Sequence, residues 1–439
     1  MGTISDKLSY LNNTKKNIKQ AIINKGVTVS DTDTFRSYAN KINSIQTGIE
    51  PKLQEKSVYE NGIITPDYGY DGLSKVTVDV QTTGGGSIGD SGGKYLVQVI
   101  DYDGTVLKSD HLNTGAIFRL PNAPTNHERL LFQEWSSPVD ITDNTVIVED
   151  QDITIGAVYT TKSGLNEFDI TLTKATGLIV NFNVADGTVN WGDGTSQDVT
   201  ELISHTYSEY GTYTITWSGT TSTSDVTRAL FGQTQSNSNY YVTDVRLVNI
   251  NARNALYILQ YCKSLKSVTI SKEQTRISQG FLQCCYSLKS ITIPSTITSL
   301  SGDLCSYCFT LESAVIPKGT TYISVGEFSH CYSLKSITIP STVTYIESSA
   351  FNNCSAIKNL KIPNTITSFG RIFTSCYNME KYDMTSLTAV PTLSDTNAFN
   401  DINGLCKIYV PDALYDEWIV ATNWSSLADY IYKASEMED

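Results

Sequence analysis

The chain has 439 residues, of which 40% are apolar and 18% charged, and its formal net charge at pH 7 is -13. A chain of this length exceeds one ordinary core, so about three to five structural units are expected. The negative charge, without any Lys/Arg cluster, excludes nucleic acid as an expected partner. No stretch approaches the roughly 18 consecutive apolar residues of a membrane span, so membrane insertion is not expected. The 26 Tyr residues, together with abundant Ser, Thr and Asn, favour β-rich structure, so a multidomain, mainly β chain is expected.

Residues 1–48 are expected to form a short helical module. Apolar residues follow an approximate helical stripe over residues 4–25, Gly26 stands where that helix would end, and a second stripe covers residues 35–45. Two helices of this size bury too little surface to be stable alone. The module is therefore expected to attach the chain to a partner or to further copies, or alternatively to cap the following domain.

A small β segment is expected over residues 49–83, where the alternation of Val76, Val78 and Val80 indicates a strand with one buried face. Residues 70–79, YDGLSKVTVD, resemble a segment of tail, fibre and minor structural proteins of phages that infect Gram-positive bacteria. This resemblance implies a virion protein of the tail tip or fibre, bound to tail or baseplate proteins through its N-terminal module. By analogy with tail fibres, it also implies a homotrimer.

Residues 84–93, GGGSIGDSGG, form a flexible linker by composition, and residues 94–162 form a small β domain. In that domain, alternating strands surround a Gly turn, a Pro-rich loop and the sequence Phe-Gln-Glu-Trp ending at Trp135. The arrangement resembles the β-grasp-like repeat of Gram-positive surface proteins, which implies a spacer. Residues 101–104, DYDG, lack the other oxygen ligands of an EF-hand, so a hairpin turn is favoured over a calcium loop.

Residues 163–226 contain Trp-Gly-Asp-Gly at 191–194, His-Thr-Tyr at 205–207 and an alternating strand that ends at Trp217. In this order and spacing the three motifs resemble the PKD domain, an immunoglobulin-like sandwich that presents other modules. Trp191 is expected to anchor the core. His205, a lone His beside a Tyr, is interpreted as a hydrogen-bonding structural residue and not as a catalytic or metal-binding one.

The strongest pattern is a repeat in residues 227–411. Its six full units align on cysteines spaced 23, 23, 23, 23 and 22 residues apart: Cys262, Cys285, Cys308, Cys331, Cys354 and Cys376. The consensus Phe-x-x-Cys-x-x-Leu-x-x-Ile-x-Ile-Pro resembles the BspA-like leucine-rich repeat, which implies a solenoid of stacked coils. Degenerate units at both ends are typical of a solenoid, and residues 412–439 are expected to form a helical cap.

The nine cysteines are compatible with structural, redox or metal-binding roles. Cys305 and Cys308 form a C-x-x-C, and Cys284 and Cys285 are adjacent. Position 305, however, belongs to a column that Leu or Phe occupies in the other units, so buried, reduced thiols are predicted. Cys284 and Cys406 are predicted to be solvent-facing exceptions, and no metal is expected.

Outward positions of stacked repeats are expected to form columns, because neighbouring strands lie about 4.8 Å apart. One column is rich in Lys, a second in Ser (Ser267, Ser290 and equivalents), and a third, just after the repeat cysteine, is aromatic. The candidate ligand-binding residues are Tyr286, Phe309, Tyr332, Tyr377, Lys289 and Lys335. Aromatic rings with polar groups suit a sugar or a protein epitope, whereas a solvated face with partly buried tyrosines is the structural alternative.

The sequence favours a non-enzymatic binding protein without a cofactor. The four histidines (111, 127, 205 and 330) lie in separate segments, and no nucleophile or paired-carboxylate motif stands out. The main prediction is a receptor-binding protein of a phage tail fibre or baseplate, or of a phage-tail-like particle, that binds a host-surface glycan or protein through the repeats. A bacterial surface adhesin is the first alternative, disfavoured by the lack of a recognisable export signal or anchor. A wall-degrading enzyme is the second alternative.

Overall fold

A computed structural model describes residues 53–57, 72–77, 92–125, 127–172, 178–182, 187–199, 203–219, 242–250, 257–399 and 404–437. The chain divides into two compact units, Met1–Asp79 and Val80–Asp439. The helices predicted for residues 1–48 and most of the linker at 84–93 lie outside the described residues. Among the helices that are described, none has the length and apolar character needed to cross a membrane.

The first unit contributes two described strands, β1 (Leu53–Ser57) and β2 (Gly72–Thr77). They pair in parallel, from Leu53 opposite Gly72 to Ser57 opposite Thr77. β2 lies within the small β segment predicted for residues 49–83.

The second unit begins with a four-stranded mixed sheet in the order β4-β3-β8-β6, in which β3 and β8 pair in parallel. Its strands and those of the accompanying β5-β7 pair are β3 (Tyr95–Ile100), β4 (Val106–Leu112), β5 (Ile117–Arg119), β6 (Leu130–Ser136), β7 (Thr145–Ile147) and β8 (Ile153–Thr161). Val97, Phe118 and Ile155 are among its core residues. The predicted hairpin turn is confirmed, because Gly104 adopts a φ of +88° and its N–H donates to the Asp101 carbonyl.

The next strands surround Trp191, which is buried as predicted. They are β9 (Asn166–Leu172), β10 (Leu178–Phe182), β11 (Thr188–Asn190), β12 (Ser196–Asp198), β13 (Ile203–Tyr207) and β14 (Gly211–Trp217). The Tyr207 hydroxyl donates to the Trp191 carbonyl at 2.7 Å. His205 Nε2 lies 2.7 Å from an Asp193 carboxylate oxygen, and its ring stacks on Trp191. These contacts support the interpretation of His205 as a structural residue.

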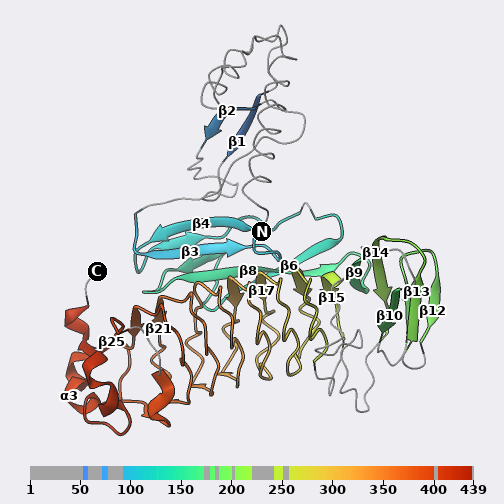
Figure 1. Ribbon diagram of the computed structural model, residues 1–439. Helices are drawn as coiled ribbons and strands as arrows, with labels where there is room; N and C mark the ends of the chain where they lie inside the picture. Colours follow the sequence, from blue (N-terminus) through green and yellow to red (C-terminus); the bar gives the residue numbers. More distant parts are fainter. Residues whose placement is uncertain are drawn as a thin grey trace, which may run out of the picture. The chain divides into compact units, whose positions relative to one another are not determined.

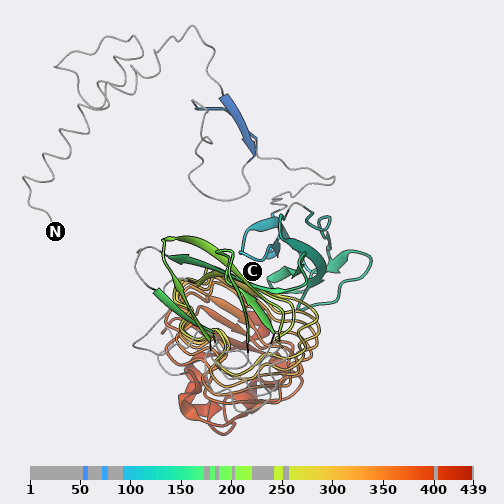
Figure 2. The same ribbon diagram turned by 90° about the vertical axis from the view of Figure 1, so that its right-hand side faces the viewer.

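The repeats form a solenoid of stacked coils, seen from the side in Figure 1 and nested one behind another in Figure 2. Strands at one repeat position are β15 (Val242–Leu247), β16 (Ser267–Ile270), β17 (Ser290–Thr292), β18 (Ser313–Val315), β21 (Asn359–Lys361), β23 (Lys381–Asp383), β25 (Lys407–Val410) and β26 (Ile431–Lys433). A second sheet contains β19 (Tyr322–Ile323), β20 (Tyr345–Ile346), β22 (Ser368–Phe369) and β24 (Thr392–Leu393). Neighbouring strands pair in parallel, with Ser290 opposite Ser313 and Tyr322 opposite Tyr345, which confirms the register of 23 residues.

The repeat cysteines line the interior of the solenoid. Each of five repeat thiols donates to a carbonyl of the preceding coil at 3.1–3.3 Å: Cys285, Cys308, Cys331, Cys354 and Cys376. All nine cysteines are free and buried, so the predicted exposure of Cys284 and Cys406 is wrong. Cys284 is 7% exposed because it packs beside Tyr286, and Cys406 is 2% exposed because it lies next to Cys376 inside the coils.

Both ends of the solenoid are covered. At the N-terminal end, β9 pairs with β15, so the sheet around Trp191 continues directly into the first coils, and one hydrophobic core runs from Phe168 to Ile431. At the other end, Trp418 and Trp424 are fully buried. The helical cap predicted for residues 412–439 is present as short helices: η2 (Asp412–Leu414), α3 (Tyr415–Trp418), η3 (Trp424–Tyr430) and η4 (Ala434–Glu436), where η denotes a 3-10 helix. A further short helix, η1 (Thr396–Phe399), precedes this segment. Covered ends are what an open stack of coils requires.

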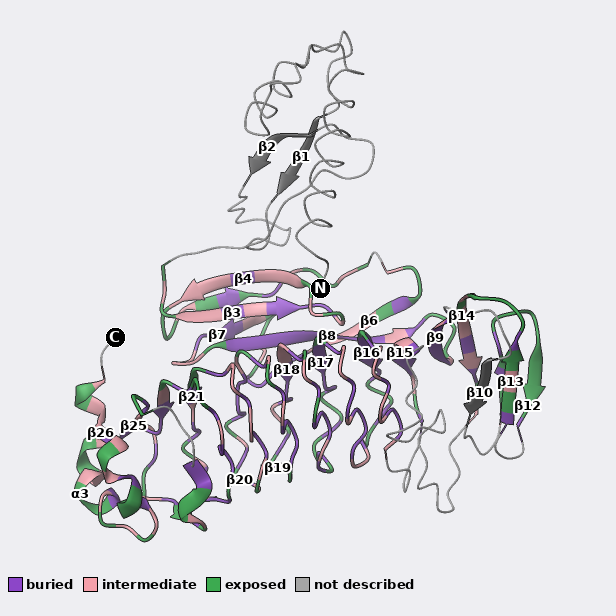
Figure 3. Ribbon diagram, viewed as in Figure 1, coloured by how far each residue is buried: buried purple, intermediate pink, exposed green. Residues whose placement is uncertain are grey.

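The sheet containing β8 lies across the strand face of the solenoid, where β8 packs against β15, β16, β17 and β18 (Figure 1). A Cβ added at Gly156 would come within 2.0 Å of Thr292 Oγ1, so only glycine allows this approach. Figure 3 accordingly shows β8 buried along most of its length. The predicted outward Ser column is covered here, since Ser267 and Ser290 are 4% and 1% exposed. The domain expected to act as a spacer therefore packs on the repeats.

Candidate functional site

Every full coil turns through a left-handed residue directly before the repeat cysteine. These residues have φ between 60° and 64°: Tyr261, Cys284, Tyr307, His330, Asn353 and Ser375. Such a conformation is unfavourable for a residue with a Cβ. It is compensated by a hydrogen bond to the next coil, as in Tyr307 N–H to Ser329 O and His330 N–H to Asn352 O, both 2.7 Å. The turn repeats in each coil, so the side chains around it form columns.

Five ring-bearing residues at these turns form a continuous set, which we call the aromatic ladder: Tyr286, Tyr307, Phe309, His330 and Tyr332. Stacked pairs link successive coils, with centroid distances of 4.6 Å for Tyr286–Phe309, 5.3 Å for Phe309–Tyr332 and 4.3 Å for Tyr307–His330. Edge contacts join the two columns, Tyr307 to Phe309 and His330 to Tyr332. Three predicted ligand-binding residues, Tyr286, Phe309 and Tyr332, therefore lie in one stack, with Phe309 in the middle.

Stacking within the ladder covers several of its ring faces. Phe309 lies between Tyr286 and Tyr332, so both of its faces are covered. One face of Tyr286 is approached by the Lys263 ammonium, 5.2 Å from the ring centroid. Tyr307 and Tyr332 remain 38% and 44% exposed. A sugar ring binds an aromatic residue across its free face, whereas exposed edges and phenol hydroxyls suit insertion into a groove of a protein partner.

The other three predicted residues lie outside the ladder. Tyr377 is 56% exposed, but Ser355 occupies the same position in the intervening coil, so Tyr377 lies two coils away from Tyr332. Lys335 forms an ion pair with Glu312 across neighbouring coils. Lys289 is exposed in the same Lys-rich column, which is separate from the aromatic turn. Because exposed ion pairs contribute about 0–1 kcal/mol, Lys335 has little influence on the stability of the coils.

Tyr307 and His330 were not predicted, although the repeat register contains the signal. Both precede a repeat cysteine by one residue, a position that holds Tyr in the first full unit as well. The His330 ring is fixed by contacts of 2.8 Å from Nδ1 to Ser329 Oγ and 3.3 Å from Nε2 to Asn353 Nδ2. Burial lowers the pKa of His330, which keeps the imidazole neutral at pH 7. The ladder is therefore an uncharged surface at neutral pH.

Burial makes the solenoid thiols poor nucleophiles at neutral pH. Burial raises the pKa of Cys284 to about 11 and that of Cys376 to about 12, and it raises the pKa of Cys331 and Cys354 as well. The thiolate, which is the reactive form, is thus scarce at neutral pH. Within the described residues, no group of three or more His, Cys, Asp and Glu side chains is placed to hold a metal ion.

A family model described as BspA type leucine rich repeat region matches residues 226–311 and 299–416, with six copies. Residues 226–416 are BspA-type leucine-rich repeats. These BspA-type repeats contain every residue of the aromatic ladder. They also contain the repeat cysteines, so each repeat unit contributes both to the aromatic ladder region and to the column of buried thiols. The resemblance of the repeats, stated above from their consensus, is thereby confirmed.

Three solved structures are similar to part of the chain. A leucine-rich repeat protein from Bacteroides ovatus is 23% identical over 38% of this chain and 42% of that chain, with a TM-score of 0.25. The T. pallidum leucine rich repeat protein is 15% identical over 42% of this chain and 89% of that chain, with a TM-score of 0.26. A leucine rich cell surface protein from Faecalibacterium prausnitzii is 18% identical over 40% of this chain and 66% of that chain, with a TM-score of 0.20. The chain thus spans less than half of the Bacteroides ovatus protein. No curated protein matches this sequence.

Proposed function

We propose that this chain is a non-enzymatic binding protein of the bacterial surface-adhesin type, and that its aromatic ladder contacts a protein partner. The observation that carries the proposal is the exposed stack of Tyr307, Phe309, Tyr332 and their neighbours on the BspA-type repeats. Buried tyrosines dominate the binding energy of many protein interfaces, because they supply rigid apolar area with a polar tip. A preformed stack adds little conformational entropy cost on binding.

Two further features support the ladder as the recognition surface. The strand face, where the sequence predicted a second polar column, is covered by β8 and is closed to a large partner along β15 to β18. The ladder is neutral at pH 7, so a protein partner can bury it without burying an unpaired charge. The proposed non-enzymatic role agrees with thiols whose pKa is raised by burial.

The proposal is tested by binding of the full chain to intact candidate cells. The double substitution Tyr307→Ala and Tyr332→Ala should weaken binding at least tenfold, since each anchor residue is expected to contribute about 2 kcal/mol or more. Tyr210, which is 71% exposed in the loop before β14, provides the matched control, and Tyr210→Ala should bind as the parent does. Protease treatment of the cells should abolish binding. Equal binding by the double variant and the control would refute the role of the ladder.

A phage receptor-binding protein is the second candidate, favoured by the resemblance of residues 70–79 to phage structural proteins. This candidate uses the same ladder but attaches it to a particle through residues 1–48. Immunogold labelling separates the two: label on bacterial cells supports the adhesin, and label on tail tips of released particles supports the phage protein. Release of soluble fragments from purified cell wall would instead indicate the wall-degrading enzyme.

A further inference from the structure

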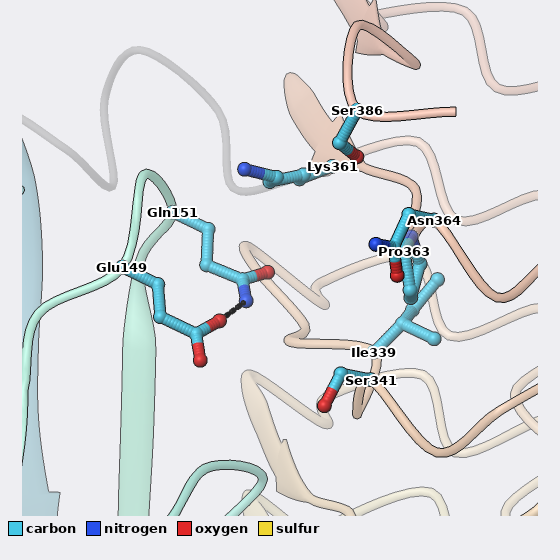
Figure 4. Close-up of a pocket in the computed structure, with 8 residues that line it drawn as sticks. All are labelled: Glu149, Gln151, Ile339, Ser341, Lys361, Pro363, Asn364 and Ser386. Carbon is cyan, nitrogen blue, oxygen red and sulfur yellow. Dashed lines mark hydrogen bonds between the residues drawn. The ribbon is translucent and has the colours of Figure 1, made fainter. Parts of the chain in front are cut away.

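A polar cleft opens where the β4-β3-β8-β6 sheet ends over the solenoid. It consists of two adjoining cavities of about 330 Å³ and about 170 Å³, which share Gln151 and Lys361 in their walls. The larger cavity falls in the size range of small-molecule sites, about 300–1,000 Å³. Figure 4 shows the smaller one, in which Glu149 and Gln151 face Lys361, Asn364 and Ser386 from the opposite wall. The cleft is distinct from the aromatic ladder.

The walls of the cleft come from segments far apart in the sequence and are held by specific contacts. Asp152 accepts a hydrogen bond from the Leu96 N–H at 2.8 Å, and its carbonyl accepts one from the Thr338 hydroxyl at 2.6 Å. Lys361 of β21 forms an ion pair with Asp150. The hydrogen bond from Gln151 to Glu149, 2.8 Å, orders the loop between β7 and β8. The shape of the cleft is therefore fixed by the packing of the sheet on the solenoid.

The charges that line the larger cavity are balanced. Three lysines and three aspartates face it, with His111 as a further titratable group: Lys94, Lys361, Lys381, Asp150, Asp152 and Asp383. Lys361 is paired with Asp150, and the Asp383 carboxylate accepts hydrogen bonds from the Thr385 N–H and hydroxyl. Burial raises the pKa of Asp152, and the hydrogen bond from the Leu96 N–H, together with the electrostatic influence of His111 and Lys381, opposes this rise. A strongly charged ligand of either sign would meet like charges inside the cleft.

We propose that this cleft binds a neutral oligosaccharide. Sugar hydroxyls both donate and accept hydrogen bonds, and the cleft offers acceptors on its aspartates and donors on its lysines, with Gln151 and Asn359 supplying both. Tyr95, also in the wall, supplies an aromatic ring. A ligand without net charge can form hydrogen bonds with these groups and adds no new charge to the equal numbers of positive and negative side chains, so the cleft stays neutral. The proposal rests on the cleft alone and does not depend on the role of the ladder.

The test measures binding of the full chain to chitotriose, cellotriose, mannotriose and maltotriose by titration calorimetry, with 3'-sialyllactose and chitosan trimer as charged probes. At least one neutral probe should bind, and the double substitution Gln151→Ala and Asn359→Ala should weaken it at least about tenfold, because two hydrogen-bonding side chains are lost. Ser336→Trp, which fills the cavity from the solenoid side, should have the same effect. Thr367→Ala, an exposed polar position beside β22, is the control and should change nothing.

Binding by none of the four neutral probes would overturn the proposal, as would equal binding by the charged ones. Unchanged affinity in both the Gln151/Asn359 and Ser336 variants would also overturn it. The Tyr307/Tyr332 ladder variant separates the two sites: it should keep sugar binding and lose cell binding. The Gln151/Asn359 variant should show the opposite pattern, so either site can fail without the other.

Discussion

Glu327 provides a test of how strongly the solenoid interior disfavours an ionised carboxyl group. It occupies the interior position that Phe281, Leu304 and Ala350 fill in other coils, and it is fully buried. Neither carboxylate oxygen has a hydrogen-bond partner of good geometry. Burial raises the pKa of Glu327 from 4.5 to about 8, Asp303 and Glu347 add to the rise, and the backbone amides of Leu304 and Gly302 oppose it in part. The carboxyl group is therefore protonated in the folded chain at pH 7.

The magnitude follows from linkage. Between pH 4.5 and about 8 the unfolded chain has lost this proton while the folded chain retains it, so stability decreases as the pH rises through this interval and levels off above it. At about 1.4 kcal/mol per pH unit, the full loss is about 5 kcal/mol, of which about 3 kcal/mol is reached at pH 7. Glu327→Gln keeps the size of the side chain and removes the titration. From pH 4.5 to pH 8.5 the stability of the variant relative to the parent should therefore rise by about 4 kcal/mol, because about 0.4 kcal/mol of the effect is already present at pH 4.5.

Urea unfolding followed by tryptophan fluorescence at pH 4.5, 6, 7 and 8.5 measures this difference. The other titrating groups are common to both proteins and cancel in the comparison. Glu312→Gln is the matched control, because Glu312 is on the surface and its ion pair with Lys335 contributes about 1 kcal/mol or less. Identical pH dependence in the parent and Glu327→Gln would refute the assignment of a raised pKa to this buried carboxyl group.

Three more perturbations have defined outcomes. Gly156→Ala should destabilise packing of the β8 sheet on the solenoid by about 1–3 kcal/mol, since its Cβ would overlap a threonine side chain, and faster limited proteolysis near β8 measures this. Arg246→Met should cost about 3–5 kcal/mol, seen as a lower Tm, because it strips Glu167 and Asp169 of their buried guanidinium partner; an unchanged Tm would contradict this. The nine thiols should resist Ellman's reagent at pH 8 until urea is added, and rapid modification of Cys284 in the folded chain would contradict its burial.

Much of the aromatic ladder follows from the repeat alone. The position after each repeat cysteine places Tyr286, Phe309 and Tyr332 in one column, because each coil contacts only its neighbours and the register of 23 residues repeats. The second column, Tyr307 and His330, was missed because its exposure depends on a left-handed turn that composition does not reveal. The same position also predicts Tyr377, but Ser355 interrupts the column and separates Tyr377 from Tyr332 by two coils.

The sequence by itself determined the mainly β class, the stacked coils, the buried repeat thiols and the covered ends, since all of these depend on local periodicity. Only the tertiary structure decided which faces of the coils stay open. The covering of Ser290 by the turn at Tyr102 and the cleft at Asp152 and Lys361 depend on the fit of two surfaces more than a hundred residues apart in the sequence. The hydrogen bond from Ser136 to the Ile293 carbonyl is one contact between these surfaces. Such complementarity depends on the shapes and charges of surfaces that meet only after folding, so it produces no periodic pattern in the sequence.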